Sequence, residues 1–155
     1  MMAGLNSDII QCWQACYEKF KDQPRKLVSN LQERGTTDQK CQAIFAYMVD
    51  NTRYKLDKSG EQLIKSPARF LSDGCGDCKS YTMFIACCLH CLGIPCIVRF
   101  VNFDGGNQYT HVYPVAIDEY GDEIIMDACE LDEKRIPIYG YAREYAKKKD
   151  LRYNC

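Results

Sequence analysis

The sequence predicts a single α+β domain in which N-terminal helices and a central buried helix pack on an antiparallel β-meander. Before Gly93, apolar side chains recur at the three- and four-residue spacing of helices. From Ile94 onward they occur in short alternating runs separated by turn residues, which is typical of strands. The length of 155 residues suits one domain with one hydrophobic core.

Two helices are expected at the start of the chain. The first covers residues 5–20, with Asn6 or Ser7 as its N-cap and apolar residues at helical spacing. The second is expected to have Pro24 in its first turn and to end at Gly35, because proline suits the first turn of a helix and glycine its C-terminal end.

A third helix is predicted to begin at Thr36, because Gln39 three residues later completes a capping box. Its apolar face is the clearest amphipathic stripe of the sequence, formed by Cys41, Ile44, Phe45, Met48 and Val49. Residues 53–73 contain several turn signals and are expected to form a loop with short irregular pieces.

The central helix is expected over residues 80–92, where nearly every side chain is apolar, and Gly93 ends it. Alternating patterns then predict three antiparallel strands at residues 96–101, 111–117 and 123–127. The C-terminal tail, residues 139–155, mixes tyrosines with a run of lysines and is expected to be a helix with a solvated basic end.

Charge and composition exclude several classes of function. The formal net charge of −1 favours neither nucleic acid nor an anionic membrane as a partner. The longest uncharged stretch, residues 80–97, contains polar residues and is a poor candidate for a transmembrane helix, and the N-terminus has no pattern of a secretion signal. The eleven cysteines accompany helical and strand patterns rather than a small loop-rich framework, so we expect free thiols and a cytoplasmic location.

Cys78 is the best candidate for a nucleophile. It follows a glycine-broken loop, residues 73–77, and stands directly before the central helix. The unpaired N–H groups and the positive dipole end of a helix favour thiolate over thiol. A thiol at this junction is therefore expected to be reactive.

His111 and Asp127 are predicted to complete a catalytic triad. If Asp118 and Asp122 flank the turn between their strands, the numbers of cross-strand partners add up to about 240, which puts Asp127 opposite Tyr113. His111 is then a diagonal neighbour of Asp127 on the same face, within reach of a hydrogen bond. His111 would exchange a proton with Cys78, and Asp127 would fix the imidazole tautomer.

Four segments together resemble the transglutaminase-like superfamily: residues 73–81, 89–99, 110–113 and 125–127. In that superfamily a Gly-x-Cys motif opens a helix that ends in a Leu-Gly-Ile-Pro turn, and the histidine and aspartate lie on the following strands. The resemblance covers residues 41–128, including a segment around Tyr54. It implies a papain-like fold with Cys78, His111 and Asp127 in the catalytic positions. Its members include cross-linkers, peptidases, deglycosylases and inactive binding modules, so it leaves the substrate open.

Alternative interpretations rest on the other cysteines. Cys75 and Cys78 resemble a thioredoxin motif, but no core strand precedes them and Pro95 follows too soon for a helix and a strand between. Cys75, Cys78, Cys88 and Cys91 also form a four-cysteine set with zinc-like spacing, although the second pair lies within the apolar helix.

The sequence therefore predicts a cysteine-nucleophile acyl-transfer enzyme that forms a thioester at Cys78. Hydrolysis of a peptide or other amide is the first expectation, and amine transfer or a non-catalytic binding module is the alternative. We expect a protein or peptide substrate and no cofactor, metal, nucleic acid or membrane. The domain divides into N-terminal helices (1–35), a catalytic core (36–128) and a C-terminal extension (129–155). The Cys78 N–H supplies one oxyanion donor; for the second, Gln62 and Asn51 are only guesses.

Overall fold

The computed structural model describes residues 4–33, 35–56 and 63–154. In chain order its elements are α1 (Ser7–Phe20), α2 (Arg25–Val28), the 3₁₀ helix η1 (Ser29–Leu31), α3 (Thr37–Asn51), β1 (Arg53–Tyr54), α4 (Pro67–Asp73), β2 (Cys75–Gly76), α5 (Cys78–Cys91), β3 (Cys96–Asn102), β4 (His111–Ile117), β5 (Glu123–Ile125) and β6 (Lys147–Tyr153).

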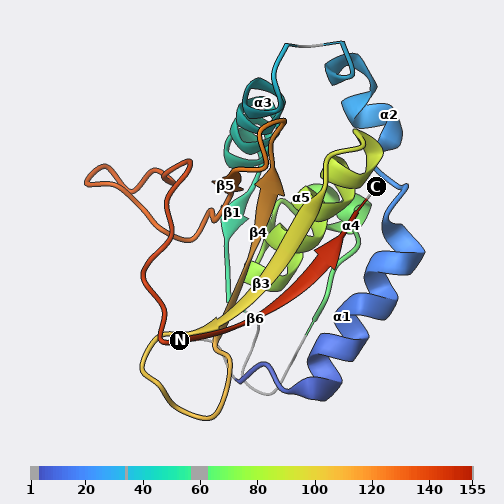
Figure 1. The fold of residues 1–155 in the computed structure, drawn as a ribbon. Helices are drawn as coiled ribbons and strands as arrows, with labels where there is room; N and C mark the ends of the chain where they lie inside the picture. The colour runs from blue at the N-terminus through green and yellow to red at the C-terminus, as the bar shows by residue number, and fades with distance from the viewer. Residues whose placement is uncertain (1–3, 34, 57–62, 155) are drawn as a thin grey trace.

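An antiparallel sheet with the strand order β5-β4-β3-β6 carries the helices on one face (Figure 1). Helix α5 packs against β3 and β4, and α1, α2, α3 and α4 contact its other sides. The opposite face of the sheet bears a smaller apolar cluster that includes Val101 and Tyr113 and is contacted by Ala142. The predicted α+β architecture, with a central buried helix on a meander, is confirmed.

The first helix begins as expected, and the second is shorter than expected. Asn6 caps α1, and its side chain accepts a hydrogen bond from the Ile9 N–H at 3.0 Å. Pro24 is the N-cap of α2 rather than part of its first turn. The α-helix ends at Val28 and continues only as the 3₁₀ turn η1, because the Ser29 hydroxyl donates to the Lys26 carbonyl and competes with the helical ladder.

The capping box at the start of α3 is confirmed in both directions. The Gln39 N–H donates to the Thr36 hydroxyl at 3.2 Å, and the Thr36 N–H donates to the Gln39 side chain at 2.9 Å. The buried face of the helix consists of Cys41, Ile44, Phe45 and Met48.

Two short strands hold the segment after α3 against the loop before α5. Strand β1 pairs parallel with β2, so that Tyr54 lies opposite Gly76. The Arg53 N–H donates to the Gly74 carbonyl at 3.0 Å, and the Lys55 N–H donates to the Gly76 carbonyl at 2.8 Å. The sequence pattern did not reveal this pairing, because strands of two residues show no periodicity.

Helix α4 also lies in the segment that was expected to be loop. Ser66 caps it by accepting from the Arg69 N–H at 3.2 Å, and Pro67 occupies its first position. The Ser66-Pro67 pair is one of the turn signals within residues 53–73, and in the structure it starts a helix. Gly74 ends α4 in the left-handed conformation, with φ 69°.

Helix α5 is buried along nearly its whole length, and only His90 among its residues is partly exposed. Gly93 follows it with φ 71°, a conformation that glycine adopts without strain. None of the helices in the described ranges combines the length and the hydrophobicity that crossing a lipid bilayer requires.

The register of the β4–β5 hairpin agrees with the prediction. Val115 pairs with Ile125 and Ile117 with Glu123, so the residue numbers add up to 240. The Met126 N–H continues the ladder with a bond to the Pro114 carbonyl at 3.0 Å. Asp127 therefore follows β5 at the position expected for a diagonal neighbour of His111.

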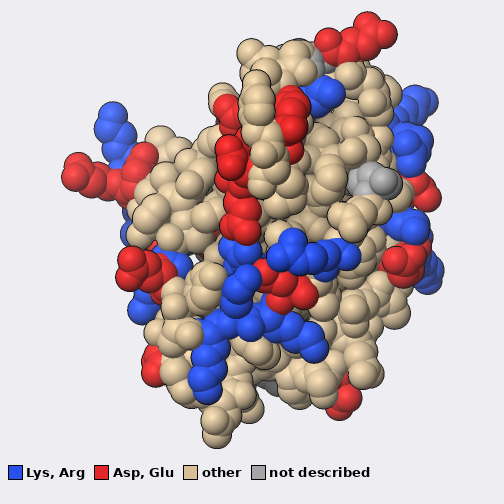
Figure 2. Space-filling model, viewed as in Figure 1, with Lys and Arg blue, Asp and Glu red and all other residues tan. Residues whose placement is uncertain are grey.

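The C-terminal tail corrects the prediction of a helix over residues 139–155, because β6 pairs antiparallel with β3 at the edge of the sheet. Buried Arg99 explains this choice: it donates to Asp150 of β6 at 2.9 Å and to both carboxylate oxygens of Glu123. A buried guanidinium needs such partners, and they outweigh the local preference of the tail. Lysines and arginines gather over the exposed edge at β6 (Figure 2), which discourages pairing with another chain.

Candidate active site

Cys78 is the first residue of α5, and its side chain is 1% exposed. Asp77 caps the helix, and its carboxylate accepts from the Lys79 N–H at 3.0 Å. A Cβ added to Gly76 would lie 2.8 Å from the Ser80 Cβ, so the loop passes too close to the helix for any larger residue. The thiol is therefore held at the positive end of the helix dipole.

A buried ion pair fixes the first turn of α5. The Lys79 ammonium lies 2.6 Å from the Asp77 carboxylate, and both side chains are 1% exposed. The Lys79 carbonyl accepts a hydrogen bond from the Trp13 indole N–H of α1 at 3.1 Å. Because a buried charge without its partner is costly, the two side chains hold the backbone on either side of Cys78.

His111 is the first residue of β4, and its Nε2 lies 2.8 Å from an Asp127 carboxylate oxygen. Both groups are buried. Burial lowers the pKa of His111, but the hydrogen bonds to Asp127 and to Cys78 outweigh it and raise that pKa to about 10. The pair therefore favours a protonated imidazole.

The imidazole joins Cys78 to Asp127. Since Nε2 is engaged with Asp127, the hydrogen bond between the Cys78 thiol and the ring falls to Nδ1. The structure thus brings together the three residues that the sequence singled out, although they come from α5, β4 and the segment after β5.

Aromatic rings enclose the imidazole. Phe103 stacks on His111 with 5.9 Å between ring centroids, and Tyr113 lies at 5.8 Å. The Arg143 guanidinium lies 4.4 Å from the centre of the Phe103 ring. These contacts limit the rotation of the imidazole and exclude water from one of its sides.

Tyr54 is a site residue to which the sequence assigned no role. The Cys78 backbone N–H donates to its hydroxyl oxygen, and burial raises the pKa of the phenol. The ring packs edge-to-face on Tyr81 with 5.8 Å between centroids. A neutral phenol beside the Cys78 N–H is placed to donate a second hydrogen bond at the same point.

Of the two guessed oxyanion donors, Asn51 is engaged away from Cys78. The Asn51 side chain donates to the Tyr47 carbonyl at 2.7 Å, at the end of α3. Gln62 lies outside the described residues.

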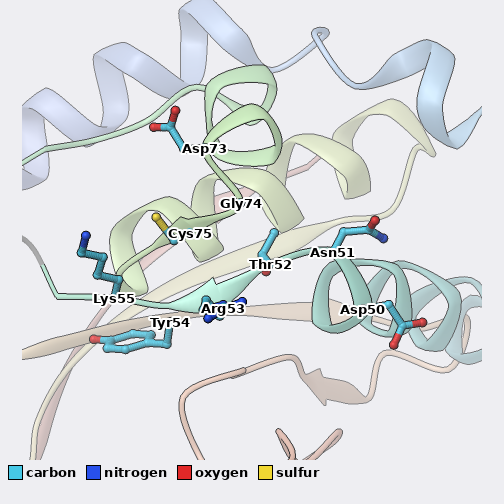
Figure 3. Close-up of a pocket in the computed structure, with 9 residues that line it drawn as sticks. All are labelled: Asp50, Asn51, Thr52, Arg53, Tyr54, Lys55, Asp73, Gly74 and Cys75. Carbon is cyan, nitrogen blue, oxygen red and sulfur yellow. The ribbon is translucent and has the colours of Figure 1, made fainter.

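Two cavities meet at Tyr54. The first has a volume of about 360 Å³ and is lined by Tyr54, Leu56, Phe103, Thr110, His111, Cys129, Glu130 and Arg143. The second, about 660 Å³ and more polar, is lined by residues 50–55 and 73–75. Figure 3 shows that in the second cavity Tyr54 and Cys75 lie on opposite sides of β1. Tyr54 thus lies between the two cavities, with His111 at the wall of the first and Cys75 at the wall of the second.

The other cysteines do not assemble as the alternatives require. Strand β2, before Cys78, belongs to the two-stranded pairing and not to the main sheet, unlike the core strand of a thioredoxin motif. Cys75 faces the second cavity, where the Lys65 ammonium contacts its carbonyl at 2.7 Å. Within the described part of the chain, Cys88 and Cys91 join no group able to hold a metal ion.

Among the described residues, a metal ion has one candidate set of ligands: His111, Asp127 and Cys129. Cys129 is half-buried, and its N–H donates to the second Asp127 oxygen at 3.0 Å. No sequence pattern selects Cys129, since it is one of eleven cysteines and lies in an irregular segment.

The arrangement of Cys78, His111 and Asp127 and the match of a family model together identify the family of this chain. A papain-like arrangement of a helix-borne cysteine, a strand-borne histidine and an aspartate defines a class of thiol enzymes. The model of the transglutaminase-like superfamily matches residues 25–128, and the chain belongs to that superfamily. The match ends directly after Asp127 and contains all three residues of the predicted triad.

Solved structures with the same fold include two candidate proteases. One is a candidate cysteine protease of Cytophaga hutchinsonii, which is 14% identical to this chain with a TM-score of 0.56. The alignment covers 86% of this chain and 51% of that protease. The other is a candidate protease of Parabacteroides distasonis, which is also 14% identical, with a TM-score of 0.61. The alignment covers 75% of this chain and 26% of that protease. This chain thus spans about half the length of the first and about a quarter of the second.

LapG of Legionella pneumophila, in its calcium-bound form, matches over most of both chains. It is 16% identical with a TM-score of 0.58, and the alignment covers 94% of this chain and 83% of LapG. At these identities the similarity shows a common fold. A comparison with curated protein sequences gives no match.

Proposed function

We propose that this protein is a thiol-dependent hydrolase of a peptide or other amide bond, with Cys78 as nucleophile, His111 as acid and base, and Asp127 as the group that orients the imidazole. The observation that carries the proposal is the continuous hydrogen-bonded chain from the Cys78 thiol through His111 to the Asp127 carboxylate at 2.8 Å. His111 and Tyr54, which both hydrogen-bond to Cys78, line a cavity of about 360 Å³.

The reaction begins with the proton on His111 and the negative charge on Cys78 Sγ. The thiolate attacks the carbonyl carbon, a C–S bond forms, and the carbonyl oxygen takes the negative charge. Collapse of this intermediate breaks the C–N bond, and His111 Nδ1 gives its proton to the leaving amine. Water then attacks the thioester while His111 takes a proton from it, and breakage of the C–S bond restores the thiolate and the protonated imidazole.

Two donors are available to the carbonyl oxygen. The Cys78 N–H donates to the Tyr54 hydroxyl oxygen in the free protein. An oxyanion that replaced this oxygen as the acceptor would accept from the Cys78 N–H and, once the phenol has turned aside, from the Tyr54 O–H as well. The short pairing of β1 with β2 supports this role, because it places Tyr54 opposite Gly76 and next to the nucleophile. Donors fixed in advance stabilise the charge that develops in the transition state.

Amine transfer is the alternative outcome of the same thioester. The protease descriptions of the structural neighbours support hydrolysis and a protein or peptide substrate. The two reactions separate in one assay, in which a glutamine-containing peptide is incubated with a fluorescent primary amine. Hydrolysis releases a shortened or deamidated peptide, whereas amine transfer attaches the fluorophore to it.

A cytoplasmic location is part of the proposal. The cysteines of the described ranges carry free thiols, which suits a reducing compartment.

The test is to label the protein with an activity-based probe for cysteine nucleophiles and to map the modified residue. We expect Cys78 to react fastest, and His111→Ala to slow its labelling. Cys75→Ser, in the same loop, is the matched control and should leave labelling and amide hydrolysis nearly unchanged. A Cys78→Ala variant that kept the amidase activity of the wild type would refute the assignment.

A further inference from the structure

Cys129 lies at the catalytic carboxylate but takes no part in the proposed reaction. Its N–H donates to one Asp127 oxygen at 3.0 Å, and its thiol hydrogen-bonds the same carboxylate. Its side chain also lines the cavity next to His111. The carboxylate thus carries the imidazole on one oxygen and has a thiol within reach.

The donor atoms of these three residues form a compact group. A nitrogen of His111, an oxygen of Asp127 and the Cys129 sulfur all lie within 4.8 Å of one another. Around a tetrahedral zinc ion, with bonds of about 2.0–2.3 Å, ligand atoms lie roughly 3.3–3.7 Å apart. Small side-chain rotations that open the 2.8 Å contact of His111 with Asp127 and bring in the Cys129 sulfur would therefore fit the group to an ion.

We propose that His111, Asp127 and Cys129 form a binding site for Zn²⁺, with a water molecule from the adjoining cavity as the fourth ligand. A set of one sulfur, one nitrogen and one oxygen ligand suits zinc and disfavours calcium and magnesium, which prefer oxygen alone. The thiol of Cys129 loses its proton to solvent when the metal binds. The two charges of the ion are then balanced by one thiolate and one carboxylate.

The surroundings of the group allow an ion to enter. His111 and Cys129 line the cavity of about 360 Å³, and Glu130 lies at its wall and adds negative charge on the route. Asp127 is 2% exposed, so the ion would be held in a poorly solvated position where its attraction to the carboxylate is strong. Cys78 faces the other ring nitrogen, Nδ1, and is not a ligand in this arrangement.

The consequence of binding rests on the proposed function. A metal on Nε2 replaces the hydrogen bond from His111 to Asp127, which is the contact that orients the imidazole. Loss of the proton on Nδ1 would then leave an imidazolate, so the ring would no longer deliver protons to a leaving amine. Zinc would hold the enzyme in a reversible inactive state.

Metal binding is tested without substrate. Zinc is titrated into the reduced full chain by calorimetry, and cobalt is used as an optical probe because thiolate ligands give a charge-transfer band. We expect one zinc ion at this site and a sulfur-to-cobalt band. Cys129→Ser should weaken zinc binding at least about tenfold and should remove the band. Even the loss of a residue that only hydrogen-bonds a metal ligand lowers metal affinity roughly 10–100-fold.

Two serine variants serve as controls. Cys12→Ser, which removes an exposed thiol of α1, and Cys78→Ser, which removes the nucleophile, should change zinc affinity less than about threefold and keep the band. Metal-free melting curves establish that each variant is folded. The proposal is overturned if Cys129→Ser binds zinc like the wild type, or if the band disappears in Cys78→Ser and persists in Cys129→Ser.

The inhibitory effect is measured within each protein, as the ratio of amide turnover with zinc to turnover after a chelator is added. We expect zinc to suppress the wild type and to suppress Cys129→Ser at least tenfold less at the same concentration. The binding result stands whether or not the protein hydrolyses amides. If zinc does not bind, the triad proposal is unaffected, so the two proposals fail separately.

Discussion

The proton on His111 makes the stability of the fold depend on pH. Because the pKa of His111 is raised from the ordinary 6.5 to about 10, its contribution is fully present below pH 6.5 and is lost as the pH rises to about 10. At 1.36 kcal/mol for each pH decade, this contribution has a ceiling of roughly 5 kcal/mol. Asp127→Asn removes the charge that holds the proton, so the pKa of the imidazole should return toward its ordinary value.

The measurement is urea unfolding of the reduced wild type and of Asp127→Asn at pH 6.5, 8 and 10. The wild type should be more stable by a few kcal/mol at pH 6.5, and the difference should shrink steadily toward pH 10. Thiols away from Asp127, such as Cys41, whose pKa burial raises to about 12, also lower stability at high pH, but they do so equally in both proteins. Burial and Asp127 together raise the pKa of Cys129, so both proteins are compared in a Cys129→Ser background. If the two curves ran parallel from pH 6.5 to 10, the charge pairing of His111 with Asp127 would be wrong.

Three further substitutions test the site and its support. Tyr54→Phe should lower kcat on an amide substrate about 10²- to 10³-fold with little change in KM, as loss of one oxyanion donor does, measured by steady-state kinetics. Gly76→Ala should destabilise the fold by about 1–3 kcal/mol in urea unfolding, because the new Cβ would lie 2.8 Å from that of Ser80. Asp150→Ala should cost about 3 kcal/mol and lower the melting temperature, because it leaves buried Arg99 with one carboxylate partner.

Each of these substitutions has a matched control. Alkylation of Cys78 does not develop an oxyanion, so Tyr54→Phe should change its rate less than about threefold. Gly106→Ala places its Cβ near the flexible Asp104 side chain and should be nearly neutral. Asp22→Ala breaks contacts with Arg25 and His90 at the surface and should cost less than about 1 kcal/mol. Equal effects in a substitution and its control would contradict the structural reason given for it.

The parts of the fold that the sequence predicted are those set by neighbouring residues. The capping box of Thr36 and Gln39 and the all-round apolar pattern of α5 act within a few residues, and both are confirmed. The turn between β4 and β5 sets a register in which a single number, 240, relates all cross-strand partners. For that reason the proximity of His111 to Asp127 could be predicted before any tertiary contact was known.

The parts that the sequence did not predict depend on distant contacts. Strand β6 forms because Arg99 of β3 needs the carboxylate of Asp150, and no pattern within the tail signals that need. The role of Tyr54 depends on the pairing of β1 with β2. Each of these strands has two residues, which is too short to show a periodicity in the sequence. Cys129 acquires its neighbours only when β5 brings the following segment under β4.

The hydrogen bond from Trp13 to the carbonyl of Lys79 gives the protein an internal optical reporter. Trp13 is the only tryptophan of the sequence, and its indole is fully buried. The carbonyl to which it donates belongs to Lys79, the residue that follows the nucleophile. Indole emission responds to the loss of a hydrogen bond and to the arrival of water. A change at the first turn of α5 therefore alters the tryptophan fluorescence, which comes from Trp13 alone. Acylation of Cys78 and the unfolding of the helix that carries it can thus be followed in the unmodified chain, without an added label.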